Sequence, residues 1–270
     1  MTTIVPQEPL ISALETQWKA IDDLVSPLSD AQWTAASPLP GWQIRDIVAH
    51  IAGTESMLAG RQPESSIDTS QIAHVKNPIG ELNERWIDHY RSRSRDELMT
   101  DLRAVTAERS KALRGMTEGQ WDAETATPAG PDTYGRFMRV RDFDCWVHEI
   151  DIRDALGLGV PENVEPAHWA LREIESSMPY VVGKKARAEV GSTVCFDITG
   201  LYPFTFFVVT EDRAAVVPAV DGEPDVTLRL DGLDLARSVG GRPSAGDAEV
   251  EVTGDTELGA AIIRSLHYLI

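Results

Sequence analysis

The chain contains 270 residues and carries a formal net charge of −18, with 25 basic against 43 acidic side chains. This acidic balance argues against a nucleic-acid partner, because binding to phosphates depends on clusters of Lys and Arg. With 42% apolar and 25% charged residues the composition is that of an ordinary soluble protein, so we expect a small molecule as the partner.

Membrane and disulfide-rich proteins are also disfavoured. No apolar run approaches the roughly 20 residues that a transmembrane helix needs, and residues 1–6 lack a basic segment followed by an apolar core. We therefore expect no membrane partner and a cytoplasmic location. Cys145 and Cys195 are too few for a disulfide framework, and both should remain thiols. Monomer and homodimer both remain open.

Residues 8–156 have the apolar spacing of helices. Near the N-terminus one stripe recurs at intervals of three and four residues, formed by Leu10, Leu14, Trp18, Ile21 and Leu24. A capping box formed by Ser94 and Glu97 begins another helix with a similar stripe. Segments 38–41 and 127–135 contain Pro and Gly and are predicted breaks. The pattern predicts four main helices packed as a bundle.

Two short segments of this region resemble each other. Residues 28–33 and 116–121 each contain a Ser or Thr cap, an acidic residue next to it, and Gln-Trp at the end. Each is followed by a loop and then by a helix that carries a histidine. Two similar helical halves would bring His50 and His148 toward the same core.

Beyond about residue 157 the pattern changes to β-type runs separated by Gly and Pro. We expect strands at 192–199, 204–210, 214–220, 226–230 and near 248–253, and helices at 169–178, 233–239 and 257–269. The sequence therefore predicts an α+β fold class, in which a helical domain at 1–160 precedes a smaller α+β domain with an antiparallel sheet at 161–270.

The helical region contains a candidate metal site. Asp144 and His148 are four residues apart, so on a helix both side chains leave the same face one turn apart. That spacing also fits a helix-stabilising pair. However, the flanking residues are apolar, and burying both groups without a partner would cost on the order of several kcal/mol. His50 lies on a second apolar helix, and two imidazoles with one carboxylate would leave a coordination position open, as in catalytic metal sites.

Two other residues remain open as ligands. Asp46 precedes His50 by four residues, although in the first turn of its helix a carboxylate would favour the helix dipole and could pair with Arg45. Cys145 lies three residues before His148, where a small buried side chain is the more ordinary interpretation. We therefore prefer Asp144 as the acidic ligand.

Segments 41–50 and 141–157 resemble the two signature helices of the mycothiol-dependent maleylpyruvate isomerase family, which also includes mycothiol S-transferases. This family belongs to the DinB-like group of metal-binding four-helix bundles. The stretch from residue 200 through 226–236 to 255 is similar to its second domain, which is related to sterol carrier protein 2 and is therefore SCP2-like. The resemblance implies a DinB-like bundle at 1–160 and an SCP2-like domain at 161–270.

The resemblance places the metal ligands on His50, Asp144 and His148, with Zn²⁺ or another divalent metal as the ion and mycothiol as the cosubstrate. The isomerase has glutamate at the middle position, so Asp144 departs from that member by one methylene. An arginine of the second domain that assists substrate or thiol binding would match Arg242, or less closely Arg237.

The activity implied is attack by a zinc-bound mycothiol thiolate on an electrophilic small molecule, in an S-transferase or in a maleylpyruvate-type cis–trans isomerase. Two alternatives remain open from the sequence. The first is a metal-dependent hydrolase that activates water. The second is a non-catalytic carrier of a lipid or another small molecule.

Overall fold

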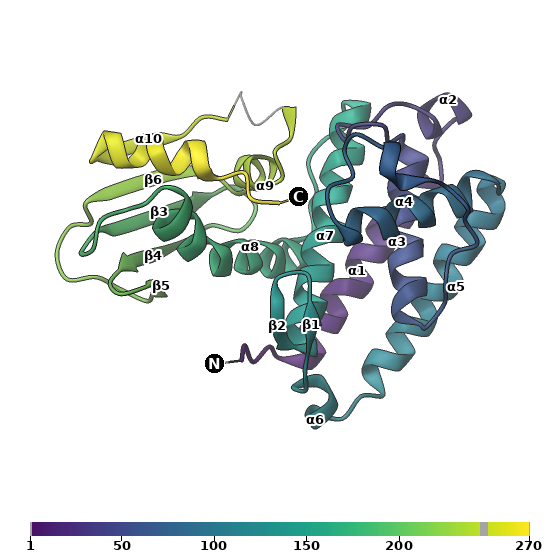
Figure 1. The fold of residues 1–270 in the computed structure, drawn as a ribbon, viewed down its shortest axis with the longest axis horizontal. Helices are drawn as coiled ribbons and strands as arrows, with labels where there is room; N and C mark the ends of the chain where they lie inside the picture. Colours follow the sequence, from purple (N-terminus) through teal and green to yellow (C-terminus); the bar gives the residue numbers. More distant parts are fainter. Residues whose placement is uncertain (1, 244–247, 270) are drawn as a thin grey trace. The chain divides into compact units, whose positions relative to one another are not determined.

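The computed structural model describes residues 2–243 and 248–269, which divide between Pro166 and Ala167 into two compact units (Figure 1). The first unit contains the helices α1 (Gln7–Val25), α2 (Asp30–Trp33), α3 (Ile44–Leu58), α4 (Pro78–Arg91), α5 (Arg95–Arg114), α6 (Glu118–Trp121) and α7 (Tyr134–Leu156), a 3₁₀ turn η1 (Thr69–Gln71), and a hairpin of β1 (Glu124–Thr127) and β2 (Gly130–Thr133). Helix α8 (Val164–Pro179) leads into the second unit.

The second unit continues from α8 into the π-helix η2 (Tyr180–Lys185). Its remaining elements are β3 (Thr193–Thr199), β4 (Phe204–Thr210), β5 (Ala214–Val217), β6 (Val226–Asp231), α9 (Gly232–Val239), β7 (Glu251–Gly254) and α10 (Thr256–Ser265). The predicted α+β class is therefore confirmed. Among the described residues, no helix is both long enough and apolar enough to cross a bilayer.

Four long helices form the bundle of the first unit. Helix α1 packs against α5 and α7, and α3 packs against the same two helices, so the four close around a common core (Figure 1). The apolar stripe of α1 is buried there, including Leu10, Leu14 and Ile21, each at 0% exposure. The predicted four-helix bundle is confirmed.

Helix α4 is an addition that the apolar pattern did not predict. It packs on α3 at Gly53, where a Cβ atom would lie only 2.5 Å from Cβ of Trp86. The absence of a side chain at Gly53 thus allows the two helices to approach closely. The other buried residues of α4 are Glu84, Ile87 and Tyr90, which form a narrow stripe on an otherwise polar helix.

The two similar segments of the sequence fold alike. Helices α2 and α6 each begin with a complete capping box, formed by Ser29 with Gln32 and by Thr117 with Gln120. Both end on a buried tryptophan, and they precede α3 and α7 respectively. The local likeness of these segments is confirmed, because both adopt the same capped turn, and α3 and α7 carry His50 and His148 respectively.

The sheet of the second unit has the strand order β5-β4-β3-β6-β7. Alternate residues of its central strands point into the core, for example Phe196, Phe206 and Leu228, which are 0–3% exposed and adjacent in register. The prediction of an antiparallel sheet holds for three of the four strand pairs. The β3–β6 pair is parallel, because the connection 218–225 carries the chain past β4 and β3 before β6 begins.

The N-terminal segment is fastened to the hairpin by Asp132 of β2. Its carboxylate accepts hydrogen bonds from Thr3 N at 2.7 Å and Thr3 Oγ1 at 2.8 Å, and from Arg136 Nη1 at 2.9 Å. Burial acts to raise the pKa of Asp132, but these hydrogen bonds lower it from 3.8 to about 2. The contacts therefore stabilise the fold most strongly while the carboxylate is ionised.

Asp132→Asn removes the ion pair with Arg136 and should lower the free energy of unfolding by about 1–2 kcal/mol at neutral pH. Because the folded-state pKa is depressed, the wild type has this stabilisation in full above its unfolded pKa of about 4 and loses it as the pH falls through about 2. The difference between the two proteins should therefore shrink over that interval.

Denaturant titrations followed by tryptophan fluorescence measure this difference, because six of the seven tryptophans precede Pro166. A difference that stays constant down to about pH 2 would contradict the assigned role of the Asp132 carboxylate.

Candidate metal centre

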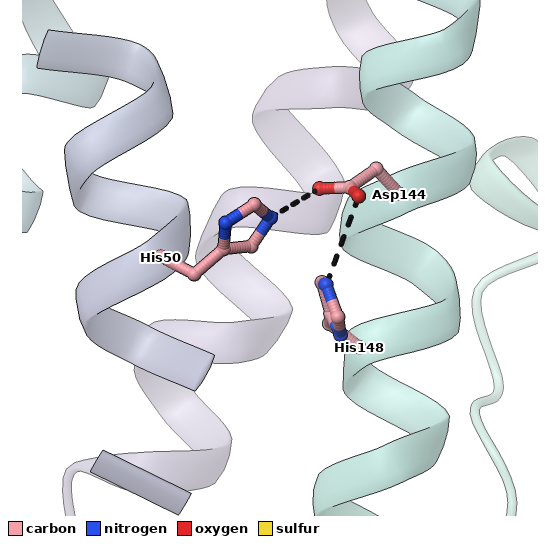
Figure 2. A group of neighbouring side chains, drawn as sticks. All are labelled: His50, Asp144 and His148. Atoms are coloured by element: carbon pink, nitrogen blue, oxygen red, sulfur yellow. Dashed lines mark hydrogen bonds and ion pairs between the residues drawn. The ribbon is translucent and has the colours of Figure 1, made fainter. Parts of the chain in front are cut away.

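Helix α7 carries two of the three predicted ligands. It begins after Thr133, whose hydroxyl accepts a hydrogen bond from Arg136 N at 3.0 Å, and ends at Gly157, where φ is 62°. Glycine adopts this left-handed backbone without steric cost and so ends the helix. Between the two caps, Asp144 and His148 lie one turn apart and point toward α3 (Figure 2).

Helix α3 carries the third predicted ligand, His50. The first turn is fixed by Asp46, whose Oδ2 accepts a hydrogen bond from Gln43 N at 2.9 Å. Ile47 and Ile51 are both 0% exposed, so this helix is embedded in the core around His50. The helix therefore delivers an imidazole into the bundle interior, opposite α7.

The three side chains meet between α3 and α7 (Figure 2). His50 Nε2 lies 3.1 Å from Asp144 Oδ2, and His148 Nε2 lies 3.7 Å from Asp144 Oδ1. The imidazole ring centroids of His50 and His148 are 4.9 Å apart, at an interplanar angle of 75°. One possible ligand atom from each residue lies within 4.8 Å of the other two, which is close enough for a single ion to bind all three.

The group is buried on its imidazole side and open at the carboxylate. The side chains of His50 and His148 are 6% and 9% exposed, whereas that of Asp144 is 30% exposed. The ring of Trp42 flanks both imidazoles, with centroids 5.4 Å from His50 and 6.1 Å from His148. Solvent therefore reaches this group at Asp144.

A second carboxylate orients His148. Asp151 lies one turn further along α7, and its Oδ2 is 3.0 Å from His148 Nδ1. Asp151 is fully buried, so this contact fixes the imidazole ring and directs Nε2 toward Asp144. Histidines that bind metals commonly have a hydrogen-bonded carboxylate at the other ring nitrogen.

Burial and neighbouring charges set the ionisation of the group. Burial would raise the pKa of Asp144, but Arg141 and the two histidines hold it well below its usual value, so the residue is a carboxylate. Burial is also the main reason why the pKa of His50 is lowered, although Asp144 opposes this shift. At neutral pH His50 is therefore the neutral imidazole that metal binding requires.

The two alternative ligands have other surroundings. Asp46 is 1% exposed and is paired through both carboxylate oxygens with Arg91, at 3.0 Å each, rather than with Arg45. Cys145 is fully buried, burial raises the pKa of its thiol well above the usual value, and its Sγ contacts Arg141 at 3.6 Å. Neither residue belongs to the group formed by His50, Asp144 and His148.

The two arginines predicted to assist binding lie in the second unit. Arg237 is on α9, where its Nη1 donates to Asp234 Oδ1 at 3.1 Å. Arg242 follows that helix and its Nη1 donates to the carbonyl oxygen of Gly240 at 2.7 Å. A part in substrate or thiol binding stays a prediction for both.

Three neighbours of the group were absent from the sequence prediction. Asp151 lies three residues after His148 and Arg141 three residues before Asp144, so helical spacing could have indicated both. Trp42 comes from the loop before α3, and nothing in its spacing signals a contact with α7. The sequence thus contained a usable signal for the polar neighbours on α7 but not for the aromatic one.

Models of two domains from one protein family match the chain. The model of the mycothiol maleylpyruvate isomerase N-terminal domain matches residues 14–153, and the model of the corresponding C-terminal domain (MDMPI) matches residues 168–261. No curated protein matches the chain.

Among solved structures, a crystal structure of the mycothiol-dependent maleylpyruvate isomerase has a TM-score of 0.59 and 18% identity, covering 92% of this chain and 93% of that chain. A histidine-to-alanine mutant of that isomerase has a TM-score of 0.56 at the same identity and coverage. These structures share the fold. Since the N-terminal family model alone matches more than half of its residues, the chain belongs to the mycothiol maleylpyruvate isomerase family.

Proposed function

We propose that this protein is a metal-dependent enzyme that uses mycothiol to attack a small electrophile, either as a maleylpyruvate-type cis–trans isomerase or as a mycothiol S-transferase. His50, Asp144 and His148 would hold the metal. The observation that carries the proposal is the convergence of these three side chains, from two helices of the family's N-terminal domain, to within 4.8 Å of one another.

The donor set fits a divalent ion with an open coordination position. Two imidazole nitrogens and one carboxylate oxygen are ligands of catalytic zinc, and the carboxylate is the exposed member of the group. The same set also suits Fe²⁺ or Ni²⁺. We favour Zn²⁺ because a thiol cosubstrate prefers a softer ion.

A bound zinc ion would lower the pKa of a coordinated thiol, so that thiolate forms at neutral pH. The side chains around it have separate parts in this proposal. Asp151 orients His148, the open side at Asp144 admits the thiol, and the Trp42 ring provides an apolar wall beside both imidazoles. Arg242, or alternatively Arg237, would pair with a carboxylate of the substrate or thiol.

In the isomerase reaction, the thiolate sulfur forms a bond to one carbon of a cis double bond that is conjugated to a carbonyl group. The π electrons move to the carbonyl oxygen, the former double bond rotates, and elimination of the thiolate restores a trans double bond. In an S-transferase the thioether is retained, either after protonation of the adduct or after loss of a leaving group. Both reactions begin with formation of a sulfur–carbon bond, so the group of His50, Asp144 and His148, which we call the ligand group, would serve either.

The wild-type protein, purified without chelator, should contain about one equivalent of divalent metal per chain, and His148→Ala should lose it because one of three ligands is removed. Elemental analysis measures the metal, and circular dichroism checks that the helices and the sheet of the second unit persist. A wild-type protein with far less than one equivalent would favour the carrier alternative.

Turnover should require mycothiol. We expect product from maleylpyruvate, or a thioether from chlorodinitrobenzene, only when mycothiol is present, and a rise in Tm with mycothiol that exceeds the rise with cysteine or glutathione at equal concentration. Chromatography of the products and of remaining thiol separates isomerisation, which regenerates the thiol, from transfer, which consumes it. Rapid hydrolysis of either compound without any thiol would instead indicate a metal-dependent hydrolase.

A further inference from the structure

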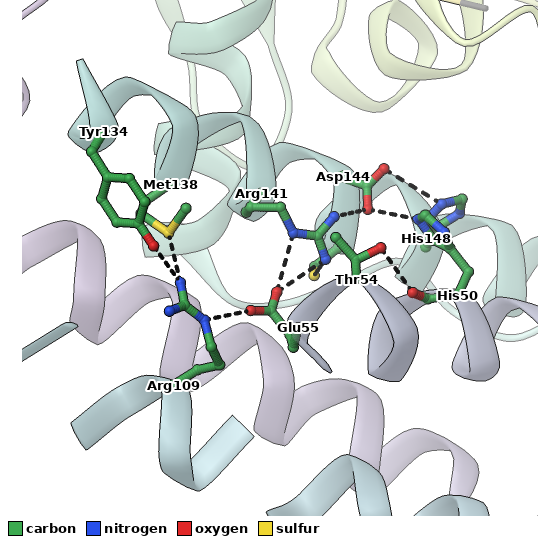
Figure 3. A network of polar contacts seen from close by, with 10 residues as sticks. His50, Thr54, Glu55, Arg109, Tyr134, Met138, Arg141, Asp144 and His148 are labelled. Carbon is green, nitrogen blue, oxygen red and sulfur yellow. Dashed lines mark hydrogen bonds and ion pairs between the residues drawn. The ribbon is translucent and has the colours of Figure 1, made fainter. Parts of the chain in front are cut away.

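A buried ionic network continues from the ligand group into the bundle (Figure 3). Arg141 of α7 lies between two carboxylates. Its Nη1 donates to Asp144 Oδ2 at 2.5 Å, and its Nε and Nη2 both donate to Glu55 Oε1 at 3.1 Å. One guanidinium group therefore connects a predicted ligand of α7 with an acidic side chain of α3.

Glu55 is held on its other side as well. Its Oε2 accepts a hydrogen bond from Arg109 Nε of α5 at 3.2 Å, and Arg109 Nη2 donates to Tyr134 Oη at 2.7 Å (Figure 3). The side chains of Glu55, Arg109 and Arg141 are only 1%, 5% and 5% exposed. The network is thus enclosed, and each of its charges faces an opposite charge.

The network connects the two helices that carry the ligand group. Glu55 is five residues after His50 on α3, and Arg141 precedes Asp144 and His148 on α7. The Glu55–Arg141 pair therefore joins the two helices that supply the ligand group. Asp144 is the most exposed member of that group, and Arg141 holds its Oδ2 while Oδ1 faces His148.

We propose that Arg141, braced by Glu55, is a positioning residue that fixes the Asp144 carboxylate and the register of α3 against α7 for metal binding. This inference rests on the proposed function, since it assumes that His50, Asp144 and His148 hold a metal. Arg141 acts through Asp144 and Glu55 and needs no contact with the ion or the thiol.

Arg141 could affect metal binding either by positioning Asp144 or through its positive charge, and a charge-matched variant separates the two effects. Removing Arg141 alone would leave one negative charge in excess, and that excess would attract a cation whatever happened to the geometry. The double substitution Arg141→Met with Glu55→Gln removes one positive and one negative charge, so the net charge is unchanged. The amide oxygen introduced by Glu55→Gln can still accept a hydrogen bond from Arg109, which limits the damage to the core.

We expect the double variant to bind Co²⁺ about 10–100-fold more weakly than the wild type, as measured by competition with a chromophoric chelator. The visible absorption of bound Co²⁺ should also change in position or intensity, because it responds to ligand geometry. A merely structural loss would lower the stability without altering that spectrum. Arg141→Lys keeps the positive charge but replaces the guanidinium group, which contacts both Asp144 and Glu55, with a single ammonium group. This variant should also bind Co²⁺ more weakly.

A matched control exists on the same helix. Asp46 and Arg91 form a two-oxygen ion pair between α3 and α4, outside the ligand group, and Asp46→Asn with Arg91→Met removes it without changing the net charge. This control variant should lose stability in thermal unfolding, yet bind Co²⁺ within about threefold of the wild type and with the same spectrum.

The outcomes are distinct. Weaker binding and an altered spectrum in the Arg141 variants, with neither change in the control, supports the positioning role. Wild-type affinity and spectrum in the charge-matched double variant, or equal losses in the control, overturns that role and leaves the proposed function standing. If the wild type itself binds no Co²⁺ or Zn²⁺, the proposed function fails and this inference fails with it.

Discussion

Charged side chains that leave water are costly without an opposite charge, and several in the first unit form ion pairs that connect different helices. Glu55 connects α3 with α5 and α7 through two arginines, and Asp46 connects α3 with α4 through a third. Such pairs add little net stability, but breaking one leaves a buried charge without a partner. A helix that rotates or slides loses its partners, so the pairs favour one arrangement of α3 within the bundle. Of these pairs, only that of Glu55 with Arg141 joins α3 to α7, between which His50, Asp144 and His148 meet.

The buried and partly buried carboxylates of the bundle differ in their partners and therefore in their roles. Asp151 is fully buried and holds an imidazole ring, Glu55 is buried between arginines, and Asp144 is partly exposed where the group meets solvent. A metal ion that enters from solvent would meet an ionised carboxylate and a neutral His50 without first removing a proton from either. Folding of the bundle therefore already places Asp144 and His50 in the protonation states that metal binding requires.

Periodicity was sufficient to predict the parts of the fold that depend on one buried face. The α1 stripe, the bundle and most strands of the second unit were predicted in this way. The pairing of Asp144 with His148 followed from their four-residue spacing within an apolar helix, whereas His50 was assigned from a second apolar helix and from the family resemblance. Ion pairs between different helices were harder to predict. Arg141 reaches Glu55, and Asp46 reaches Arg91, only because of how α3 is rotated toward its neighbours, and spacing within one helix contains no such information. The parallel β3–β6 pair was missed for a similar reason, because alternation shows that a residue faces the core but not which strand lies beside it.

The ring of Trp42 lies about as far from each site imidazole as neighbouring aromatic rings do in a protein core. An ion shared by His50 and His148 would therefore have an indole fluorophore in its neighbourhood. Open-shell ions such as Co²⁺ and Ni²⁺ quench indole emission at short range, whereas Zn²⁺, with its filled d shell, does not. For a metal held by this group, Trp42 would serve as an intrinsic optical reporter that separates open-shell ions from Zn²⁺ without a label or a substrate.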